Sequence, residues 1–421
     1  MADDSDMIDM DGSKVESARV QIAPIPRISM QAFCETPAVA EMIDDASIDR
    51  RMAKAHVKVH MGGAGAAVEA YRSAPTPNLM VLEAGDNRDE LLQHLDDLAE
   101  LCDPGSKVIV IGRINDIVLF RELIARGISD YLITPVDTLT FIQTISTLYG
   151  DPEGEPLGKV IAVTGAKGGV GASCLAHNLA WEISREFDLS TVIADVDLAF
   201  GTAGLDFNQD PPQGIAEAIF APDRLDANLV DRLLSKCTDR LSLLAAPATL
   251  DRVYDFDEAA FDGLIDILRS TTPLVVMDVP QMWISWSKRL LVGADDVVIV
   301  ASPDLANLRN AKNLIDTLRA ARPNDSAPKL VMNMVGVPKR PEISVADFAK
   351  ALELAPVGAI PFEPKLFGTA ANNGQMLGEV EQGNKITETV GEIAMSLMGR
   401  AEQKAPKKKL SLPFVSRLRG K

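Results

Sequence analysis

The sequence predicts an α/β protein built from two doubly wound domains, each with a parallel sheet. Short apolar runs alternate with longer amphipathic stretches along most of the chain. Strands that alternate with helices in this way form parallel sheets covered by helices on both faces. The alternation is interrupted at residues 150–158, where three Gly, two Pro and three acidic residues are typical of a linker. A length of 421 residues also fits two or three domains.

The first alternating series covers residues 27–149. Its expected strands are the apolar runs RISMQAF, VKVH, NLMVLEA, KVIVIGR and DYLITP. Amphipathic stretches such as RDELLQHLDDLAELC and DIVLFRELIARG lie between these runs and have apolar residues at helical spacing. Residues 1–26 are acidic, end in a Pro-spaced segment and show neither helical nor alternating periodicity, so we expect a flexible arm there.

The second alternating series covers residues 159–400. Its expected strands are KVIAVTG, STVIADVD, LSLLAAP, PLVVMDVP, DDVVIVASP, KLVMNMVG and PVGAIPF. Continuous apolar runs of this kind are typical of strands buried on both faces, so we expect a large central sheet of about seven strands. A basic tail, residues 401–421, follows this series.

The composition excludes several classes of protein. The chain has 42 basic and 60 acidic residues and a formal charge of −18, which argues against general affinity for nucleic acid. The amino terminus is acidic, and no long uncharged apolar stretch is present, so neither secretion nor a membrane span is expected. The four cysteines lie far apart and form no CxxC pair, which fits a reduced, cytoplasmic protein.

The segment KVIAVTGAKGGVGASCLAHNLAWEIS predicts a phosphate-binding loop. An apolar strand is followed by a glycine cluster and then by a helix. Gly168, Gly169 and Gly171 would allow backbone N–H groups to surround phosphate oxygens, and the positive end of the helix dipole would face the same anion. Ser173 would place a hydroxyl on Mg²⁺. Glycines also serve tight turns, but strand, KGGVG, Ser and helix together favour a nucleotide site.

Two further segments supply carboxylates for a magnesium nucleotide. Asp195 and Asp197 end the run STVIADVD, so both are expected at the carboxyl edge of the sheet, although they could merely cap a loop. Asp278 closes the buried run PLVVMD. Because Mg²⁺ keeps several waters and takes few protein ligands, one such carboxylate is sufficient to hold its water shell.

These motifs resemble the ParA/MinD superfamily of P-loop NTPases with a deviant Walker A motif. The resemblance covers about 240 residues and implies an ATP sandwich dimer in which Lys167 reaches across to the partner's nucleotide. It implies that Ser173 and Asp278 serve Mg²⁺ and that Asp197 positions the hydrolytic water. The nucleotide-binding residues implied are Lys167, Gly168, Gly169, Val170, Gly171, Ala172, Ser173, Cys174, Asn333 and Pro361, of which Asn333 and Pro361 belong to the adenine side.

One position departs from this family pattern. The family motif ends Gly-Lys-Ser/Thr, whereas this chain has Ala172 between Gly171 and Ser173. The missing lysine normally contacts the β and γ phosphates, so its loss should weaken ATP binding and the stabilisation of the transition state. We therefore expect an ATP-dependent dimerisation switch with slow or absent hydrolysis.

The first domain resembles a response-regulator receiver whose phosphorylation chemistry is lost. The acidic pair after the first strand is reduced to Glu35, the phosphorylated Asp is replaced by Glu83, and the lysine before the last Pro is Thr134. Glu83 could imitate a phosphoaspartate, but we expect an ordinary solvated glutamate at a strand end. The resemblance implies a degenerate receiver that docks other proteins.

The order of the two domains resembles the CpaE/TadZ pilus-assembly proteins of the tight-adherence secretion system. This resemblance implies a homodimeric ATP-binding scaffold for Flp/Tad type IV pilus assembly at the cell pole, with pilus proteins or polar landmark proteins as partners. An alternative is a hydrolysing partition or division-site ATPase that acts on DNA or membrane. An oxidoreductase of the iron-protein type is a third class, which the positions of Cys102 and Cys237 oppose.

Other conspicuous residues receive structural interpretations. His56 and His60 are four apart but surround a predicted strand, so neither they nor His177 are expected to bind metal. Cys174 is expected to pack the helix on the sheet rather than to act as a redox switch. Trp283 and Trp286 follow Asp278 and are interpreted either as partner or dimer contacts or as core residues.

The tail combines basic and apolar residues. From residue 404 it has no acid, and its basic residues are Lys404, Lys407, Lys408, Lys409, Arg417, Arg419 and Lys421. Such a segment is attracted to anionic lipid, so the protein could lie at the inner membrane, while a solvated basic tail is the alternative.

Overall fold

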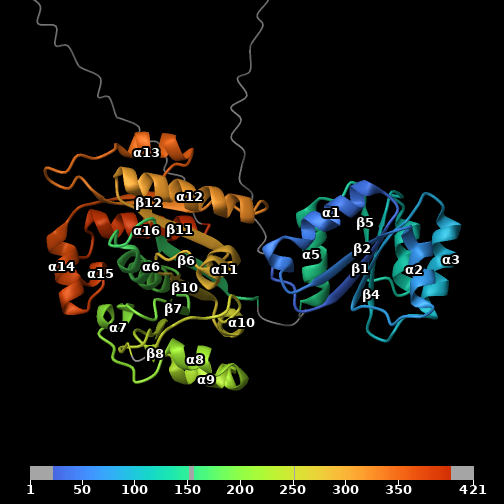
Figure 1. Cartoon of the computed structure of the whole chain (residues 1–421), viewed down its shortest axis with the longest axis horizontal. Helices are drawn as coiled ribbons and strands as arrows, with labels where there is room; N and C mark the ends of the chain where they lie inside the picture. The colour runs from blue at the N-terminus through green and yellow to red at the C-terminus, as the bar shows by residue number, and fades with distance from the viewer. Residues whose placement is uncertain (1–21, 151–155, 251, 400–421) are drawn as a thin grey trace, which may run out of the picture.

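The computed structural model describes residues 22–150, 156–250 and 252–399. The chain forms two parts, each with its own sheet, which lie side by side (Figure 1). The amino-terminal part ends with the helix before residue 150, and the carboxyl-terminal part begins with the strand that follows residue 158. The fold is α/β in both parts, as the sequence predicts.

The amino-terminal sheet has five parallel strands in the order β2-β1-β3-β4-β5. These strands are β1 (Ser29–Cys34), β2 (His56–Met61), β3 (Leu79–Glu83), β4 (Lys107–Gly112) and β5 (Asp130–Ile133). One face is covered by α1 (Pro37–Ser47) and α5 (Thr138–Tyr149). The other face is covered by α2 (Gly63–Tyr71), α3 (Arg88–Ala99) and α4 (Ile117–Ala125). All five strands lie where the apolar runs predict them.

The carboxyl-terminal sheet has eight strands in the order β13-β12-β11-β6-β10-β7-β9-β8. The seven predicted strands are present and parallel: β6 (Lys159–Gly165), β7 (Thr191–Asp195), β9 (Leu241–Leu244), β10 (Leu274–Asp278), β11 (Asp296–Ala301), β12 (Lys329–Val335) and β13 (Gly358–Pro361). The eighth, β8 (Ser235–Lys236), pairs antiparallel with β9 at one edge. With two residues, β8 is too short to produce a hydrophobic pattern in the sequence.

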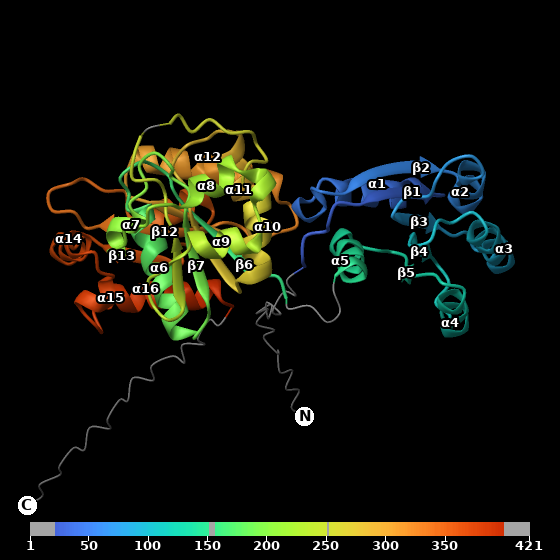
Figure 2. The same cartoon turned by 90° about the horizontal axis from the view of Figure 1, so that it is seen from below.

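Helices cover both faces of the eight-stranded sheet (Figures 1 and 2). One apolar core joins it to α8 (Ile215–Phe220), α9 (Ala227–Leu233), α10 (Asp262–Thr271), α11 (Ser285–Gly293), α12 (Leu305–Ala321) and α13 (Val345–Leu352). The other core joins it to α6 (Ala172–Glu186), α7 (Ala203–Asp206), α14 (Pro364–Asn373), α15 (Leu377–Val380) and α16 (Lys385–Leu397). Because all main strands are parallel, their carboxyl ends meet at one edge of the sheet, where ligands bind in such folds.

The expected arm is shorter than the sequence analysis predicts. Ile25 is fully buried, and its N–H donates to the carbonyl oxygen of Arg51 at 2.8 Å. Ser146 on α5 donates to the carbonyl oxygen of Ala23 at 2.9 Å. Residues 22–26 therefore belong to the folded amino-terminal part, because their apolar side chains complete its core. Residues 1–21 and the tail at 401–421 lie outside the described residues.

The two parts meet at the amino edge of the eight-stranded sheet, next to α10 and α11 (Figures 1 and 2). Arg50, in the short 3-10 helix η1 (Arg50–Met52), contacts Asp325 at 2.6 Å and Asp295 at 3.2 Å. It also donates to the carbonyl oxygen of Gly293, the last residue of α11, at 3.1 Å. The contact is therefore made with the strand starts, far from the edge where a ligand is expected.

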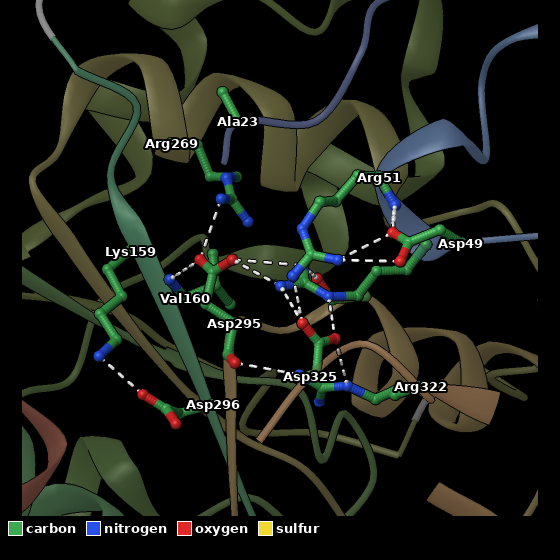
Figure 3. Close-up of polar contacts among 12 residues, drawn as sticks. Ala23, Asp49, Arg51, Lys159, Val160, Arg269, Asp295, Asp296, Arg322 and Asp325 are labelled. Atoms are coloured by element: carbon green, nitrogen blue, oxygen red, sulfur yellow. Dashed lines mark hydrogen bonds and ion pairs between the residues drawn. The ribbon is translucent and has the colours of Figure 1, made fainter. Parts of the chain in front are cut away.

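These ion pairs are buried and shared among several charges (Figure 3). Arg51 binds Asp49 at 2.9 Å and also contacts Asp325, which Arg322 holds at 3.0 Å. On the other side, Arg269 binds Asp295 at 2.9 Å. Each of these side chains is less than a tenth exposed. We call this set, Asp49, Arg50, Arg51, Arg269, Asp295, Arg322 and Asp325, the interdomain ion cluster.

No helix among the described residues is both long enough and apolar enough to span a bilayer.

Candidate functional site

The glycine loop lies between β6, which ends at Gly165, and α6, which begins at Ala172. Gly169 and Gly171 have φ values of 78° and 82°, a backbone region that glycine adopts at little cost. A Cβ placed on Gly168 or Gly169 would meet no atom within 4 Å, and residues 167–169 are exposed. The loop is therefore open on its outer side, where its N–H groups and the start of α6 can receive an anion.

Asn333 supports this loop from behind. Its side-chain N–H donates to the carbonyl oxygen of Val170 at 2.8 Å, and its Oδ1 accepts the N–H of Met334 at 2.8 Å. A Cβ on Gly171 would come within 2.6 Å of the Asn333 amide nitrogen, so this close approach requires glycine. Asn333 is buried and its amide is already bonded, whereas Pro361 is exposed at the end of the neighbouring β13.

Two carboxylates end adjacent strands beside the loop. Asp195 and Asp278 are the last residues of β7 and β10, and the strands place them directly opposite each other. Both are buried, and Asp195 accepts the N–H groups of Asp197 and Ala203 at 3.2 and 3.1 Å. Burial, with the charge of Asp278, raises the pKa of Asp195 to about 7. A cation at this edge would therefore be strongly favoured.

Asp197 lies two residues beyond β7 and is half-buried. Its Oδ1 accepts the N–H of Phe200 at 3.1 Å, which shows that it does cap a turn. Burial also raises the pKa of the Asp197 carboxyl, and the nearby charge of Asp278 adds to this effect. The turn holds Asp197 at the same edge as Asp195 and Asp278, so the structure brings the three predicted carboxylates together.

Sequence reasoning missed His177, which lies in the same group. The imidazole is completely buried on α6, with Nδ1 at 2.7 Å from Asp206 Oδ2 and Nε2 at 3.5 Å from Asp278 Oδ2. Burial lowers the pKa of His177, but the two carboxylates outweigh it and raise this pKa to about 10. The only signal in the sequence was its position four residues after Ser173, which is the spacing of one helical turn.

The residues present fit a magnesium nucleotide. Among the described residues no group of three His, Cys, Asp or Glu side chains could hold a metal ion. Mg²⁺ bound through phosphate and water needs only one or two protein ligands, and Asp278 and Ser173, the second residue of α6, lie next to the open glycine loop. When bound, the ion would neutralise phosphate charge, while the loop would hold the phosphates through its N–H groups.

Lys167 and Ala172 lie at opposite ends of the loop. Lys167 is exposed. Burial raises the pKa of Asp304, but hydrogen bonds from Asn307 and the charge of Lys167 hold this pKa below its usual value. Ala172 is the first residue of α6 and is partly buried. The position that carries the second lysine in the family motif therefore contributes no charge to the phosphate side.

Cys174 follows Ser173 on α6. Its thiol accepts a weak hydrogen bond from Asn178, and burial raises the thiol pKa to about 12. A thiol that stays protonated is a poor nucleophile, which agrees with a packing role. His56 and His60 lie on β2, a strand, so the four-residue spacing does not place them on one helical face.

The expectation that Glu83 is solvated is wrong. Glu83 is buried at the end of β3, and Oε2 accepts the N–H groups of Glu35 and Thr36 at 2.7 and 2.8 Å. Its other oxygen accepts the Thr36 hydroxyl at 2.6 Å. The carboxylate is therefore turned inward and anchors the start of α1, because these N–H groups would otherwise lack a partner.

Exposed apolar side chains lie on loops at the same edge of the sheet as the glycine loop. Trp286 is 2% exposed and belongs to the core, whereas Trp283 is 48% exposed, so the two tryptophans have different roles. Other exposed apolar residues also follow the carboxyl ends of strands. We call this set the apolar rim: Phe200 after β7, Leu250 and Val253 after β9, Met282, Trp283 and Ile284 after β10, and Leu305 after β11.

Comparison with known proteins gives two kinds of relative. A solved structure of the pilus assembly protein CpaE from Caulobacter crescentus is 46% identical, and the match covers 31% of this chain and all of that one, with a TM-score of 0.30. The sequence identity over that entire chain establishes the relationship. No family model matches this chain.

The other relatives are septum site-determining proteins. MinD from Synechocystis is 26% identical over 230 residues, which are 52% of this chain and 82% of that protein. The structure of MinD from Pyrococcus horikoshii in complex with Mg-ADP is 16% identical and covers 59% of this chain and all of that one, with a TM-score of 0.52. This second likeness shows a shared fold.

Proposed function

The chain belongs to the CpaE pilus assembly proteins of the ParA/MinD superfamily, and on this premise we propose that it is an ATP-dependent scaffold. It would bind ATP with Mg²⁺, dimerise on the nucleotide and dock components of the Flp/Tad type IV pilus at the cell pole. The observation that carries the proposal is the open glycine loop beside the buried carboxylates of Asp195 and Asp278.

Nucleotide binding rests on complementary charge. The loop offers N–H donors and the start of α6, which suit phosphate, while the buried carboxylates favour a divalent cation next to it. A bare phosphate would be repelled by Asp195, Asp197 and Asp278. ATP with Mg²⁺ satisfies both the loop and the acids, and a MinD structure of the same fold was solved with Mg-ADP.

Dimerisation rests on the apolar rim. Large apolar side chains are exposed on the loops that follow four strands of the sheet, β7, β9, β10 and β11, all at the edge that carries the glycine loop. Several large apolar side chains exposed at one edge are typical of a protein contact surface. Lys167 is exposed in the glycine loop, and the proposal assigns it the contact with a nucleotide bound by a second copy.

Slow or absent hydrolysis follows from Ala172. An uncharged side chain at the start of α6 removes one cation from the phosphate side, where charge develops in the transition state. Dimerisation needs only ATP binding, whereas repeated cycles need fast hydrolysis. We therefore favour a switch that stays assembled while ATP is bound over the hydrolysing partition or division-site alternative.

Partner docking is assigned to the amino-terminal part. Its Glu83 is bonded inward, so a phosphoryl switch at this position is disfavoured. The exposed surface of this part is then left to bind pilus proteins or polar landmark proteins.

The basic tail, outside the described residues, would bring the cytoplasmic protein to anionic lipid of the inner membrane. If deletion of residues 404–421 leaves binding to anionic liposomes unchanged, the membrane role is excluded.

The central test measures ATP affinity, oligomeric state and turnover together in the full chain. Wild type should bind ATP, dimerise with it and hydrolyse it slowly. Lys167→Ala should lose ATP-dependent dimerisation, while Lys312→Ala, an exposed lysine on α12 paired with Asp316, should not. Ala172→Lys should raise ATP affinity and turnover. The proposal fails if Lys167→Ala dimerises with ATP like wild type, or if wild-type turnover equals that of ordinary family ATPases.

A further inference from the structure

The buried imidazole of His177 connects two segments of the site that are distant in the sequence. Asp206 lies on α7, the short helix that follows the turn of Asp197, and Asp278 ends β10. The imidazole of α6 lies between these two carboxylates, with Nδ1 toward Asp206 and Nε2 toward Asp278. His177, a side chain of α6, thus contacts both α7 and the end of β10.

The geometry places a carboxylate at each ring nitrogen. Nδ1 of His177 lies 2.7 Å from Asp206 Oδ2, and Nε2 lies 3.5 Å from Asp278 Oδ2. Among the described residues, Asp278 Oδ2 and His177 Nε2 are both buried without a hydrogen-bond partner at standard distance, and they lie 3.5 Å from each other. The imidazole therefore borders the carboxylate from inside the protein and restricts its orientation.

The position of His177 differs from that of a lysine in the glycine loop. Ala172 places no cation in front of the carboxylates, on the phosphate side, whereas His177 places an imidazole behind them, inside the protein. Groups that hold a metal-ligating side chain from behind commonly change metal affinity by about 10- to 100-fold when removed. The site would therefore depend on His177 for its use of Mg²⁺ rather than for phosphate binding.

We propose that His177 is a positioning residue that holds Asp278 in its Mg²⁺-binding orientation and anchors α7 to the site through Asp206. This inference rests on the proposed function, because it concerns the same nucleotide site. On this proposal, the gain in ATP affinity that Mg²⁺ provides depends on an imidazole that does not contact the nucleotide.

Two substitutions separate the two nitrogens. In His177→Asn the amide lies where Nδ1 was, so the bond to Asp206 can persist and the contact with Asp278 is lost. In His177→Gln the amide reaches the position of Nε2, so the contact with Asp278 can persist. The measurement is the affinity for ATP with Mg²⁺ and with EDTA, by titration calorimetry on the full chain, with His56→Asn on the exposed β2 surface as the control.

His177→Asn should reduce the gain in ATP affinity that Mg²⁺ provides by about tenfold, while affinity in EDTA stays within about twofold of wild type. His177→Gln should retain most of the gain, and His56→Asn all of it. If His177→Asn keeps the full Mg²⁺ effect, or if both variants lose affinity equally with and without Mg²⁺, the inference is overturned.

A second measurement needs no nucleotide. The chain has four histidines, of which His177 is buried, so its ring can be assigned in nitrogen-proton spectra of the wild type. The Nδ1 resonance should shift in Asp206→Asn, because Nδ1 lies 2.7 Å from Asp206 Oδ2. An unchanged Nδ1 resonance in this variant would contradict the inference. Failure of wild type to bind ATP at all would instead refute the proposed function and leave this result standing.

Discussion

The two edges of the eight-stranded sheet differ in how their polar groups are satisfied. At the amino edge, the interdomain ion cluster pairs every buried carboxylate with arginines of the same chain. At the carboxyl edge, Asp195 and Asp278 lie side by side and the pKa of Asp195 is raised, the glycine loop is open, and the apolar rim is exposed. The buried carboxylates of the amino edge find their partners within the chain, whereas the open glycine loop of the carboxyl edge is left to bind a ligand.

The charged residues of the two edges therefore have different roles, one in stability and the other in ligand binding. Buried ion pairs contribute little net stability compared with apolar packing, but each becomes costly once one partner is removed. The amino edge therefore fixes how the two parts sit against each other. At the carboxyl edge, burial and the charge of Asp278 make the ionised form of Asp195 unfavourable, which is typical of a binding site. Substitutions at the two edges should accordingly affect different measurements.

The largest effect is expected from Asp325→Asn. The change leaves three buried arginines, Arg50, Arg51 and Arg322, without their shared carboxylate. Breaking a buried ion pair in this way costs about 3–5 kcal/mol in the free energy of unfolding, measured in urea. Asp266→Asn, which breaks the exposed contact with Lys54, should cost about 0–1 kcal/mol. Equal losses in the two variants would show that the cluster has no special role.

At the opposite edge, Trp283→Asp should weaken ATP-dependent dimerisation by about 2–4 kcal/mol, because exposed tryptophans at the centre of an interface contribute most to binding. Sedimentation equilibrium with ATP measures the effect. Stability of the monomer should change by no more than about 0.5 kcal/mol, as for other surface positions. Ile117→Asp on α4, an exposed apolar position outside the rim, is the control and should dimerise normally.

A smaller effect is expected from Asn333→Ala. The substitution removes the hydrogen bond to Val170 and leaves the buried loop carbonyl without this partner, at a cost of about 1–3 kcal/mol. Because the bond shapes the glycine loop, we expect the loss mainly in ATP affinity, measured by calorimetry. Asn373→Ala at the end of α14 removes an exposed hydrogen bond and should leave this affinity unchanged.

The smallest effect is expected from acid, which should lower the free energy of unfolding through Asp325 at the amino edge. Burial raises the pKa of Asp325, but the hydrogen bond and charge of Arg50, with the charges of Arg322 and Arg51, hold it below its usual value. The unfolded chain therefore takes up a proton at this residue at higher pH than the folded chain. The free energy of unfolding should decrease as pH falls through about 4 and below.

Unfolding measured in urea between about pH 6 and pH 3 tests this slope. Asp325→Asn, which has no carboxyl to titrate, should show a shallower decrease than wild type. Parallel slopes for the two proteins would contradict the assignment to Asp325.

Features formed by residues that are close together in the sequence could be predicted. The strands were readable because Val, Ile and Leu form continuous runs, and the glycine loop because its residues are adjacent. Asp195 and Asp278 could be placed at one edge because both end apolar runs, although they are far apart in the chain. Their proximity follows from the parallel topology alone.

Contacts between distant residues left no such signal. Arg50 and Asp325 are 275 positions apart, and neither lies in a pattern that indicates burial. Ile25 appeared to belong to the arm because its partners come from η1 and α5. The burial of Glu83 was mispredicted and the contacts of His177 were missed for the same reason, since their partners, Thr36 and Asp206, come from other elements. A single polar residue shows its role only when its neighbours are known.

The attachment of the amino-terminal part to the amino edge has a consequence for valency. If two copies join through their carboxyl edges, a two-fold axis passes between the sheets, and the contact uses one face of each copy. The two amino-terminal parts then lie at the outer ends of the pair, pointing away from the axis. Such a pair would present two identical docking modules at a fixed separation, so ATP would convert a monovalent protein into a bivalent one. A partner array with matching spacing would be bound with avidity that neither module has alone.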